Sequence, residues 1–421
     1  MKADFAVRNV GVLASLAGPR PRLGAAMRDL GLIERAALAS AAGRIVYVGP
    51  DRDLASQVEL ENAAVVDAEG AAVIPGLVDA HTHLAFAGNR DDEIRKRLAG
   101  ASYREIAEAG GGIVRTVAAT RSAVKEDLVR GIRCRLDEML LQGTTTAEIK
   151  SGYGLATEAE IRSLEAIREA DLAHPMVAVP TFLGAHEVPV EMKGDRERYL
   201  ETVCQEMIPE VARRRLASFC DVFCEEGVFT VAESRRILET AREHGLKLRL
   251  HADELTWTGG AELAADLGAR SADHLIFVSE GGMRAMAAAS CVATLLPSAA
   301  FYLRLDRYAP ARKLIEAGAA VALATDANPG GGLSPSMPFA MTVACFGMGL
   351  SLEEALTAAT VNAACSLDLD DRVGSLEVGK QADLLILRSA RLLDLLRVGV
   401  PAVRTVVKGG KVVVREGRLL A

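Results

Sequence analysis

Short runs of aliphatic and β-branched residues recur eight times along the middle of the chain, and stretches with helical spacing separate them. Strands that alternate with helices predict parallel βα units. Eight such units in about 300 residues match a (β/α)8 TIM barrel, an α/β fold. The expected strands are Gly76–His83, Thr144–Lys150, Val177–Phe182, Asp221–Glu225, Leu246–Ala252, Ser271–Ile276, Val292–Leu296 and Ala320–Thr325. The expected helices between them include Glu158–Ala170, Val231–His244 and Gly259–Leu267.

Both chain ends show a different pattern, in which short alternating strands surround turns. FAVRNVGVL and GRIVYVG lie before residue 72, whereas VGSLEVGKQADLLIL and VRTVVKGGKVVVREGRL lie after residue 372. Neither end is large enough to bury a sheet alone. We therefore predict one small composite β-sandwich domain, built from residues 1–72 and 373–421, beside a catalytic barrel of residues 73–372.

Composition narrows the choice of partners. Lys and Arg total 49 against 56 Asp and Glu, and the resulting net charge of −7 is a poor match for nucleic acid, which attracts dense basic patches. The uncharged stretches Ala285–Leu303 and Ala327–Leu352 are interrupted by proline and, in the second, by glycines, so we expect no membrane span. Seven scattered cysteines, an odd number, indicate a reducing compartment. We expect a soluble, cytoplasmic protein that binds a small molecule.

Histidines gather at the ends of the expected strands. His81 and His83 form an HxH at the end of the first strand, His251 ends the fifth, His274 lies in the sixth, and Asp326 follows the eighth. Carboxyl ends of barrel strands meet at one mouth, where imidazoles and a carboxylate can form an open metal site. A pair of surface histidines is the usual alternative for an isolated HxH. Five of the seven histidines lie at or just after expected strands, which favours a metal site. The predicted ligands are His81, His83, His251 and Asp326.

These residues belong to longer motifs that resemble the amidohydrolase superfamily, namely PGLVDAHTH, the HADE at 251–254, the DH at 273–274 and the TDANPG at 325–330. More narrowly, FAGNR, SYREI, GGGI, IKSGYGL, TFLGAHEVP and DVFCEEGVF resemble the imidazolonepropionase family. The resemblance covers nearly the whole chain. It implies hydrolysis of 4-imidazolone-5-propanoate to N-formimidoyl-L-glutamate in histidine degradation. It also implies one zinc or iron ion per chain and a homodimer.

One feature favours a single metal ion over two. Relatives with two metals usually have a carbamylated lysine at the end of the fourth strand, but this strand ends Cys224-Glu225-Glu226. Lys150 belongs to the second strand and is not a candidate. A glutamate that bridges a second ion stays open as an alternative.

The resemblance further implies two overlapping sets of residues around the substrate. The implied catalytic residues are Asp326, His274, Glu254 and His186. The implied substrate-binding residues are Arg90, Tyr103, Tyr153, His186, Glu254, Asn328, Gly330 and Gly331.

Roles follow from the implied substrate, whose propanoate suits the guanidinium of Arg90. Asp326 is expected to accept a proton from a metal-activated water and to help deliver it to the departing ring nitrogen. We expect His274 to hydrogen-bond that water or the developing oxyanion. His186 is expected to hydrogen-bond the imidazolone or its oxygen, where it could polarise the ring carbonyl. Glu254 would hold a ring N–H. The family usually has Ser or Thr where this chain has Gly331, so a hydroxyl contact is expected to be missing.

Two alternatives stay open at this point. Another amidohydrolase that acts on a purine, pyrimidine or imidazole compound would share the metal ligands and differ in the loops around Arg90, Tyr153 and His186. A non-catalytic barrel, used as a scaffold or binding protein, would be expected to have lost metal ligands, and all are present here.

Overall fold

The structure, a computed structural model, describes residues 1–101, 105 and 111–420. Eight parallel strands lie side by side in chain order, and each pairs with the next along the chain. They are β6 (Leu77–Asp79), β7 (Thr144–Lys150), β8 (Val177–Ala185), β9 (Phe219–Cys224), β10 (Lys247–Ala252), β11 (Ser271–His274), β12 (Val292–Leu295) and β13 (Val321–Leu323). The sequence-based prediction of eight parallel strands is confirmed, although several strands are shorter than expected.

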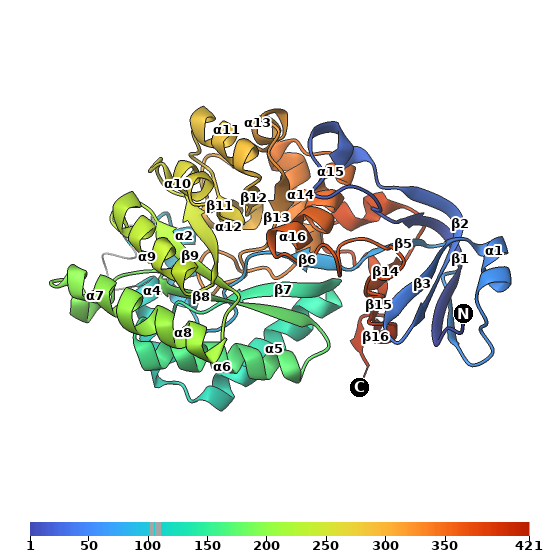
Figure 1. Cartoon of the computed structure of the whole chain (residues 1–421), viewed down its shortest axis with the longest axis horizontal. Coiled ribbons are helices and arrows are strands. Elements are labelled where there is room, and N and C mark those ends of the chain that lie inside the picture. The colour runs from blue at the N-terminus through green and yellow to red at the C-terminus, as the bar shows by residue number, and fades with distance from the viewer. Residues whose placement is uncertain (102–104, 106–110, 421) are drawn as a thin grey trace.

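Helices follow the strands and cover the outside of the barrel (Figure 1). They are α2 (Asp91–Leu98), α4 (Ile113–Ser122), α5 (Lys125–Leu141), α6 (Thr157–Leu172), α7 (Arg196–Thr202), α8 (Ile208–Arg214), α9 (Val231–Glu243), α10 (Gly260–Asp266), α11 (Glu280–Ala289), α12 (Pro297–Leu303), α13 (Ala311–Glu316), α14 (Met337–Met348), α15 (Leu352–Ala358) and α16 (Val361–Ser366). Helix α9 shows why such segments are helical. Thr230 and Glu233 form a capping box at its start, and Ile237, Leu238 and Ala241 form its buried face.

The two chain ends build a second sheet beside the barrel, as Figure 1 shows at its right-hand side. Its nine strands are β1 (Phe5–Ala14), β2 (Leu32–Ala41), β3 (Arg44–Pro50), β4 (Ala64–Asp67), β5 (Ala72–Pro75), β14 (Leu384–Leu387), β15 (Val403–Lys408), β16 (Lys411–Arg415) and β17 (Arg418–Leu419). Antiparallel pairing of β5 with β14 joins the two ends. Helix α1 (Asp51–Gln57) packs on β2 and β3.

One small hydrophobic core explains why neither end forms this domain alone. It combines Val7 and Leu38 from the amino-terminal strands with Leu384, Ile386 and Val407 from the carboxy-terminal strands. The prediction that both ends build one β domain is thus confirmed. The division into residues 1–72 plus 373–421 and residues 73–372 stays a prediction. In the described part of the chain, no helix is long and apolar enough to cross a membrane.

A buried carboxylate helps to close the barrel between its first and last strands, which share no strand ladder. Asp79 is fully buried, and its Oδ1 accepts hydrogen bonds from the backbone N–H of Thr325 at 3.1 Å and of His81 at 3.4 Å. The Thr325 hydroxyl donates to Asp79 Oδ2 at 2.5 Å. Beyond this contact, the backbone N–H of Asp326 donates to the His81 carbonyl at 3.1 Å. Asp79 therefore fixes the relative positions of two segments that carry predicted metal ligands.

We predict that Asp79→Ala destabilises the fold by about 2–4 kcal/mol, because it leaves buried donors without an acceptor. Thermal or urea unfolding measures the effect. The control Asp67→Ala removes an exposed aspartate that also accepts hydrogen bonds, from Asn9 and Glu69, and should cost less than about 1 kcal/mol. Equal stability losses in the two variants would contradict this account of barrel closure.

Candidate active site

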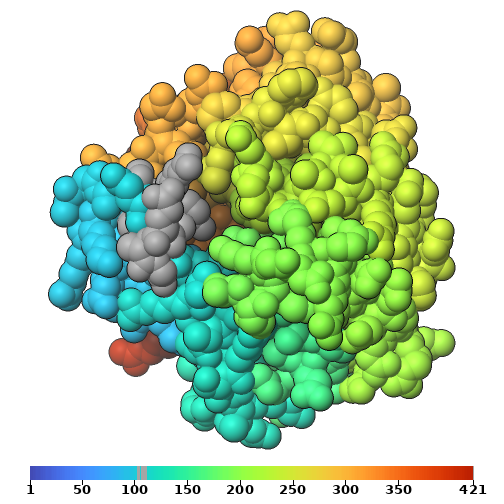
Figure 2. All heavy atoms as spheres, turned by 90° about the vertical axis from the view of Figure 1, so that its left-hand side faces the viewer, coloured from blue at the N-terminus to red at the C-terminus, as the bar shows by residue number. Residues whose placement is uncertain are grey.

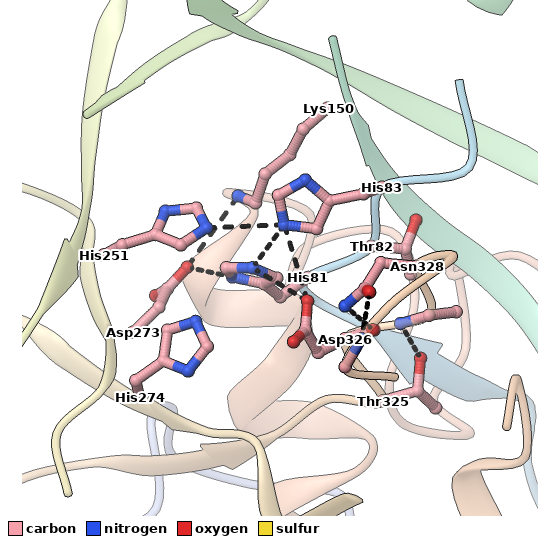
Figure 3. Close-up of polar contacts among 12 residues, drawn as sticks. His81, Thr82, His83, Lys150, His251, Asp273, His274, Thr325, Asp326 and Asn328 are labelled. Carbon is pink, nitrogen blue, oxygen red and sulfur yellow. Dashed lines mark hydrogen bonds and ion pairs between the residues drawn. The ribbon is translucent and has the colours of Figure 1, made fainter. Parts of the chain in front are cut away.

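Five of the residues predicted for chemistry converge where the barrel strands end (Figure 3). His81 and His83 follow β6, His251 lies in β10, His274 ends β11, and Asp326 follows β13. All five are at least nine-tenths buried. Successive residues of an extended segment point to opposite faces, so the HxH spacing sends both imidazoles to the same side. The barrel thus gathers side chains that lie far apart in the sequence.

Four ligand-type atoms surround one point. The Nε2 atom of His83 lies 3.2 Å from Nε2 of His81, 3.3 Å from Nε2 of His251 and 3.4 Å from Oδ1 of Asp326. The Oδ1 atom of Asp326 is 3.6 Å from Nε2 of His81. Ligands bound tetrahedrally at about 2.0–2.1 Å from one ion would lie about 3.4 Å apart. The three imidazoles therefore form a group whose spacing fits one metal ion, and Oδ1 of Asp326 lies close to two of them.

The protonation of the imidazoles also suits a cation. Nδ1 of His81 lies 2.6 Å from Oδ2 of Asp273, and Nδ1 of His251 lies 3.0 Å from Oδ2 of Asp221. Nδ1–H of His81 donates to the Asp273 carboxylate and Nδ1 of His251 faces the Asp221 carboxylate, so the Nε2 lone pairs are left to face the common point. Oδ1 of Asp326 is buried and accepts no hydrogen bond from the described residues. Lone pairs and an orphaned carboxylate oxygen that face one another are stabilised when they share a positive ion.

Burial prepares the histidines to act as ligands. It lowers the pKa values of His81 and His83 well below the usual histidine value, and nearby Lys150 and His251 act in the same direction. Both imidazoles are therefore neutral, as metal ligation requires.

Buried carboxylates lie beside these rings, and buried cations lie beside the carboxylates; neither set was predicted from the sequence. Lys150 Nζ lies 2.7 Å from both Asp221 Oδ2 and Glu148 Oε1, and Arg249 Nη2 lies 3.1 Å from Asp273 Oδ2. All five side chains are fully buried. Charged residues inside the strand segments TTTAEIK and LKLRLHA were the available signal. We call these five residues the charge cluster.

The charge cluster bears on the number of metal ions. Ligand-type atoms of His81, Asp221 and Asp273 form a second close group, but the Lys150 ammonium donates a hydrogen bond to Asp221 in that group and lies 3.9 Å from Asp273 Oδ2. Glu225, which follows strand β9, accepts hydrogen bonds from the backbone of Glu226 and Leu255 at 2.9 Å each and from the Thr256 hydroxyl. Its two oxygens thus anchor the loop after β10. This arrangement favours one metal ion over two.

Glu254 and His274 lie next to the ligand atoms. The two ring nitrogens of His274 make no hydrogen bond within the described residues, and its Nδ1 is 3.5 Å from Glu254 Oε1. Burial, together with the nearby Asp326 carboxylate, raises the pKa of Glu254 well above its usual value. A buried protonated glutamate can donate a proton or a hydrogen bond to a ligand.

Backbone strain accompanies this part of the site. His274 and Asp326 have φ values of 75° and 54°, in the left-handed region that non-glycine residues seldom adopt. Such conformations cost about 1–3 kcal/mol each and occur preferentially at functional sites.

His186 has a defined hydrogen-bonding state. Its Nδ1–H donates to the Gly152 carbonyl at 2.9 Å, and its ring stacks on His83 with centroids 5.0 Å apart. Burial, aided by His251, lowers the pKa of His186 to about 3, so the ring is neutral. The Nε2 atom is therefore a hydrogen-bond acceptor. This tautomer suits a ring N–H of the substrate better than the predicted polarisation of a carbonyl, which needs a donor.

Arg90 supplies an unpaired positive charge in the same pocket. Its side chain is 3% exposed, its Nε–H donates to Thr116 Oγ1 at 2.8 Å, and its Nη2 is buried without a hydrogen-bond partner. Within the described ranges it forms no ion pair with a carboxylate. The Tyr153 ring lies nearby, 5.9 Å from the guanidinium carbon. A buried guanidinium without a counter-ion is energetically unfavourable, so the site favours binding of an anionic ligand.

One pocket joins the cationic and metal-ligand ends of the site. Figure 2 shows a central hollow where parts of the chain coloured cyan, green and orange meet. Of the predicted residues, the pocket is lined by His83, Arg90, Tyr153, His186, His251, Glu254, His274, Asp326, Asn328 and Gly331. Its apolar walls, which the sequence analysis did not identify, are Ile113, Phe223, Leu255 and Leu303. Predicted Tyr103 lies outside the described residues, and Gly330 does not line the pocket.

Asn328 mainly shapes the loop after β13. Its Oδ1 accepts hydrogen bonds from the backbone N–H groups of Gly330 at 2.8 Å and Gly331 at 2.6 Å. Its Nδ2 donates to the Asp326 carbonyl at 2.8 Å. The amide therefore links the predicted metal ligand Asp326 to the glycines that follow.

We predict that Lys150→Met lowers the free energy of unfolding by about 3–5 kcal/mol, because it leaves buried carboxylates without their cation. The control Lys2→Met breaks an exposed pair in which Lys2 Nζ lies 4.0 Å from Glu59, and it should cost less than about 1 kcal/mol. Denaturant unfolding of the metal-loaded proteins measures both. A Lys150→Met protein as stable as the parent would contradict the role given to the charge cluster.

Comparison with known proteins agrees with this geometry. Residues 72–413 match the model of the Amidohydrolase family. The imidazolonepropionase of Symbiobacterium thermophilum is 49% identical, with 99% of this chain and 98% of the relative covered. The imidazolonepropionase of Alkaliphilus metalliredigens is 45% identical over the full length of both chains. That of Geobacillus kaustophilus is 49% identical over 98% of each.

Solved structures show the same fold at low sequence identity. An adenosine deaminase from Xanthomonas campestris with bound zinc superposes with a TM-score of 0.75 at 20% identity, covering 100% of this chain and 94% of that one. The guanine deaminase of E. coli gives a TM-score of 0.74 at 18% identity, covering 98% and 99%.

Proposed function

Since the chain belongs to the amidohydrolase family and, within it, to the imidazolonepropionases, we propose that it hydrolyses 4-imidazolone-5-propanoate to N-formimidoyl-L-glutamate. This reaction opens a cyclic amide by breaking a C–N bond in histidine degradation. The observation that carries the proposal is the position of Arg90. Its buried, unpaired guanidinium faces the same pocket as the metal-ligand set, so one ligand with a carboxylate and a hydrolysable ring can satisfy both.

We propose that His81, His83, His251 and Asp326 hold one zinc or iron ion, since imidazole and carboxylate ligands accept either metal. A metal ion bound there would act as a Lewis acid and lower the pKa of a coordinated water towards about 7.

The chain's own residues bind and orient the substrate. Arg90 binds the propanoate through the Nη2 that has no partner among the described residues, with Tyr153 beside it. The unprotonated Nε2 of His186 accepts a hydrogen bond from a ring N–H. The stacked rings of His83 and His186 and the side chain of Phe223 form flat walls of the pocket, which suits a planar five-membered ring.

Proton transfer is assigned to the two carboxyl groups near the reacting carbon. Asp326 accepts a proton from the attacking water and delivers it towards the departing ring nitrogen. Protonated Glu254 donates a hydrogen bond to the substrate and exchanges a proton as the ring opens. His274 lies 3.5 Å from Glu254 and hydrogen-bonds the developing oxyanion.

We further propose a cytoplasmic homodimer that binds neither nucleic acid nor membranes. The net charge of −7 and the burial of most of its free cysteines support the compartment and the choice of partner. The dimer follows from the resemblance to the family, and sedimentation of the purified protein would test it.

The decisive experiment is hydrolysis of freshly generated 4-imidazolone-5-propanoate by the purified, metal-loaded protein. N-formimidoyl-L-glutamate should be followed directly, because the substrate also decays without enzyme. We expect product formation that a chelator abolishes and that added zinc or iron restores. A rate equal to the uncatalysed rate, with the metal shown to be bound, would refute the proposal. Release of ammonia from a purine or pyrimidine would instead support an aminohydrolase.

We predict that Arg90→Met lowers kcat/KM for this substrate by about 100-fold or more, because it removes a buried charge that pairs with the propanoate. Metal content should not change, since Arg90 is not among the ligand atoms. The control Arg115→Met removes an exposed arginine that pairs with Asp92 on the neighbouring helix, and should leave kcat/KM within about two-fold. Steady-state kinetics with both variants would show whether the buried guanidinium binds the substrate.

A further inference from the structure

The guanidinium of Arg90 rests against a glycine that does not face the pocket. A Cβ atom built on Gly330 would overlap Arg90 Nη1 and would lie 3.1 Å from Cζ and 3.2 Å from Cδ. Because Gly330 has no side chain, its backbone can pack directly against the guanidinium of Arg90. The Nε–H of the same side chain donates to Thr116 Oγ1.

Gly330 is itself fixed in place. Its N–H donates to Asn328 Oδ1 at 2.8 Å, and its carbonyl accepts a hydrogen bond from Arg97 Nη2 at 3.0 Å. Arg97 lies in helix α2, and Arg90 is the residue that precedes the first turn of the same helix. Two arginines of this helix and its start therefore contact Gly330. Arg97 binds the Gly330 carbonyl, and Arg90 packs against the Gly330 α-carbon.

The same loop is tied to the predicted metal ligand. Asn328 donates its Nδ2–H to the Asp326 carbonyl, and its backbone N–H donates to the Gly332 carbonyl at 2.9 Å. A Cβ on Gly332 would overlap the Asp326 carbonyl, so the turn closes directly on that residue. These contacts connect the guanidinium of Arg90 to Asp326 through a short, rigid segment.

We infer that Gly330 is a positioning residue, whose missing side chain sets the place of the Arg90 guanidinium relative to the metal-binding atoms. This inference rests on the proposed function and changes the role given to Gly330, from direct substrate contact to support of Arg90. The distance between a buried cation and the reacting centre limits the length of acid side chain that the pocket accepts. Gly330 is thus a determinant of specificity for a short carboxylate side chain.

Gly330→Ala tests the inference because the atom that must yield is the end of a flexible arginine side chain. We expect the variant to fold, to bind its metal, and to move the guanidinium. KM should rise about 10-fold or more while kcat stays within about three-fold, since the metal-binding atoms are untouched. The control is Gly194→Ala, on the loop after β8, where an added Cβ has no atom within 4 Å. Its kinetics should match those of the parent.

A double-mutant cycle separates positioning from a general structural effect. If Gly330 acts through Arg90, Gly330→Ala should lower kcat/KM about 10-fold or more in the parent but less than about three-fold in an Arg90→Met background. An equal factor in the two backgrounds, or an unchanged KM in the single variant, would overturn the inference.

A second variant and a binding measurement complete the test. If Gly330→Ala does not fold, Thr116→Val removes the hydroxyl that holds Arg90 Nε and should show the same dependence on background. The affinity for 3-(imidazol-4-yl)propanoate, compared with the affinity for imidazole, measures the contribution of the carboxylate contact without catalysis. Loss of the preference for the carboxylate in Gly330→Ala supports the inference, and an intact preference refutes it. Failure of the parent to hydrolyse the imidazolone would refute the proposed function separately.

Discussion

The ion pair between Lys150 and Asp221 is the interaction on which the rest of the site depends. Asp221 and Asp273 orient two imidazoles only while they stay ionised inside a fully buried barrel, and a carboxylate in that position requires a nearby cation. Lys150 and Arg249 provide it. The site is therefore built in layers: buried cations hold carboxylates, carboxylates hold the rings of His81 and His251, and these rings present their lone pairs at the barrel mouth.

Much of the fold and of the ligand set could be predicted from the sequence, because both depend on local patterns. Alternating strand and helix periodicities predicted the barrel, and the HxH spacing, with His251 and Asp326 at other strand ends, pointed to residues that the structure brings close together. Strand-end positions are informative since parallel strands all finish at the same mouth. The β6–β13 contact is different, because it depends on the single buried side chain of Asp79.

Other features of the site depend on tertiary contacts that no local pattern encodes. The acceptor state of His186 follows from one hydrogen bond to Gly152, on another loop, and the sequence-based role as a donor to a carbonyl fits that state less well. The charge cluster involves side chains from β7, β9, β10 and β11, and no pattern within a single strand shows that they meet. Gly330 belongs to a family motif, but only the structure shows what lies beside its α-carbon. That space is filled by the Arg90 side chain and is not part of the pocket.

The closure of the barrel has a consequence for the order of folding. His81 and Asp326 come from the first and last units of the barrel, so their contact in the native state spans the whole set of strands. A partly folded chain can bring together the histidines of the HxH but not the carboxylate that completes the set. Tight metal binding therefore requires the folded barrel. The bound ion would stabilise the native state and would not stabilise incomplete or misfolded chains.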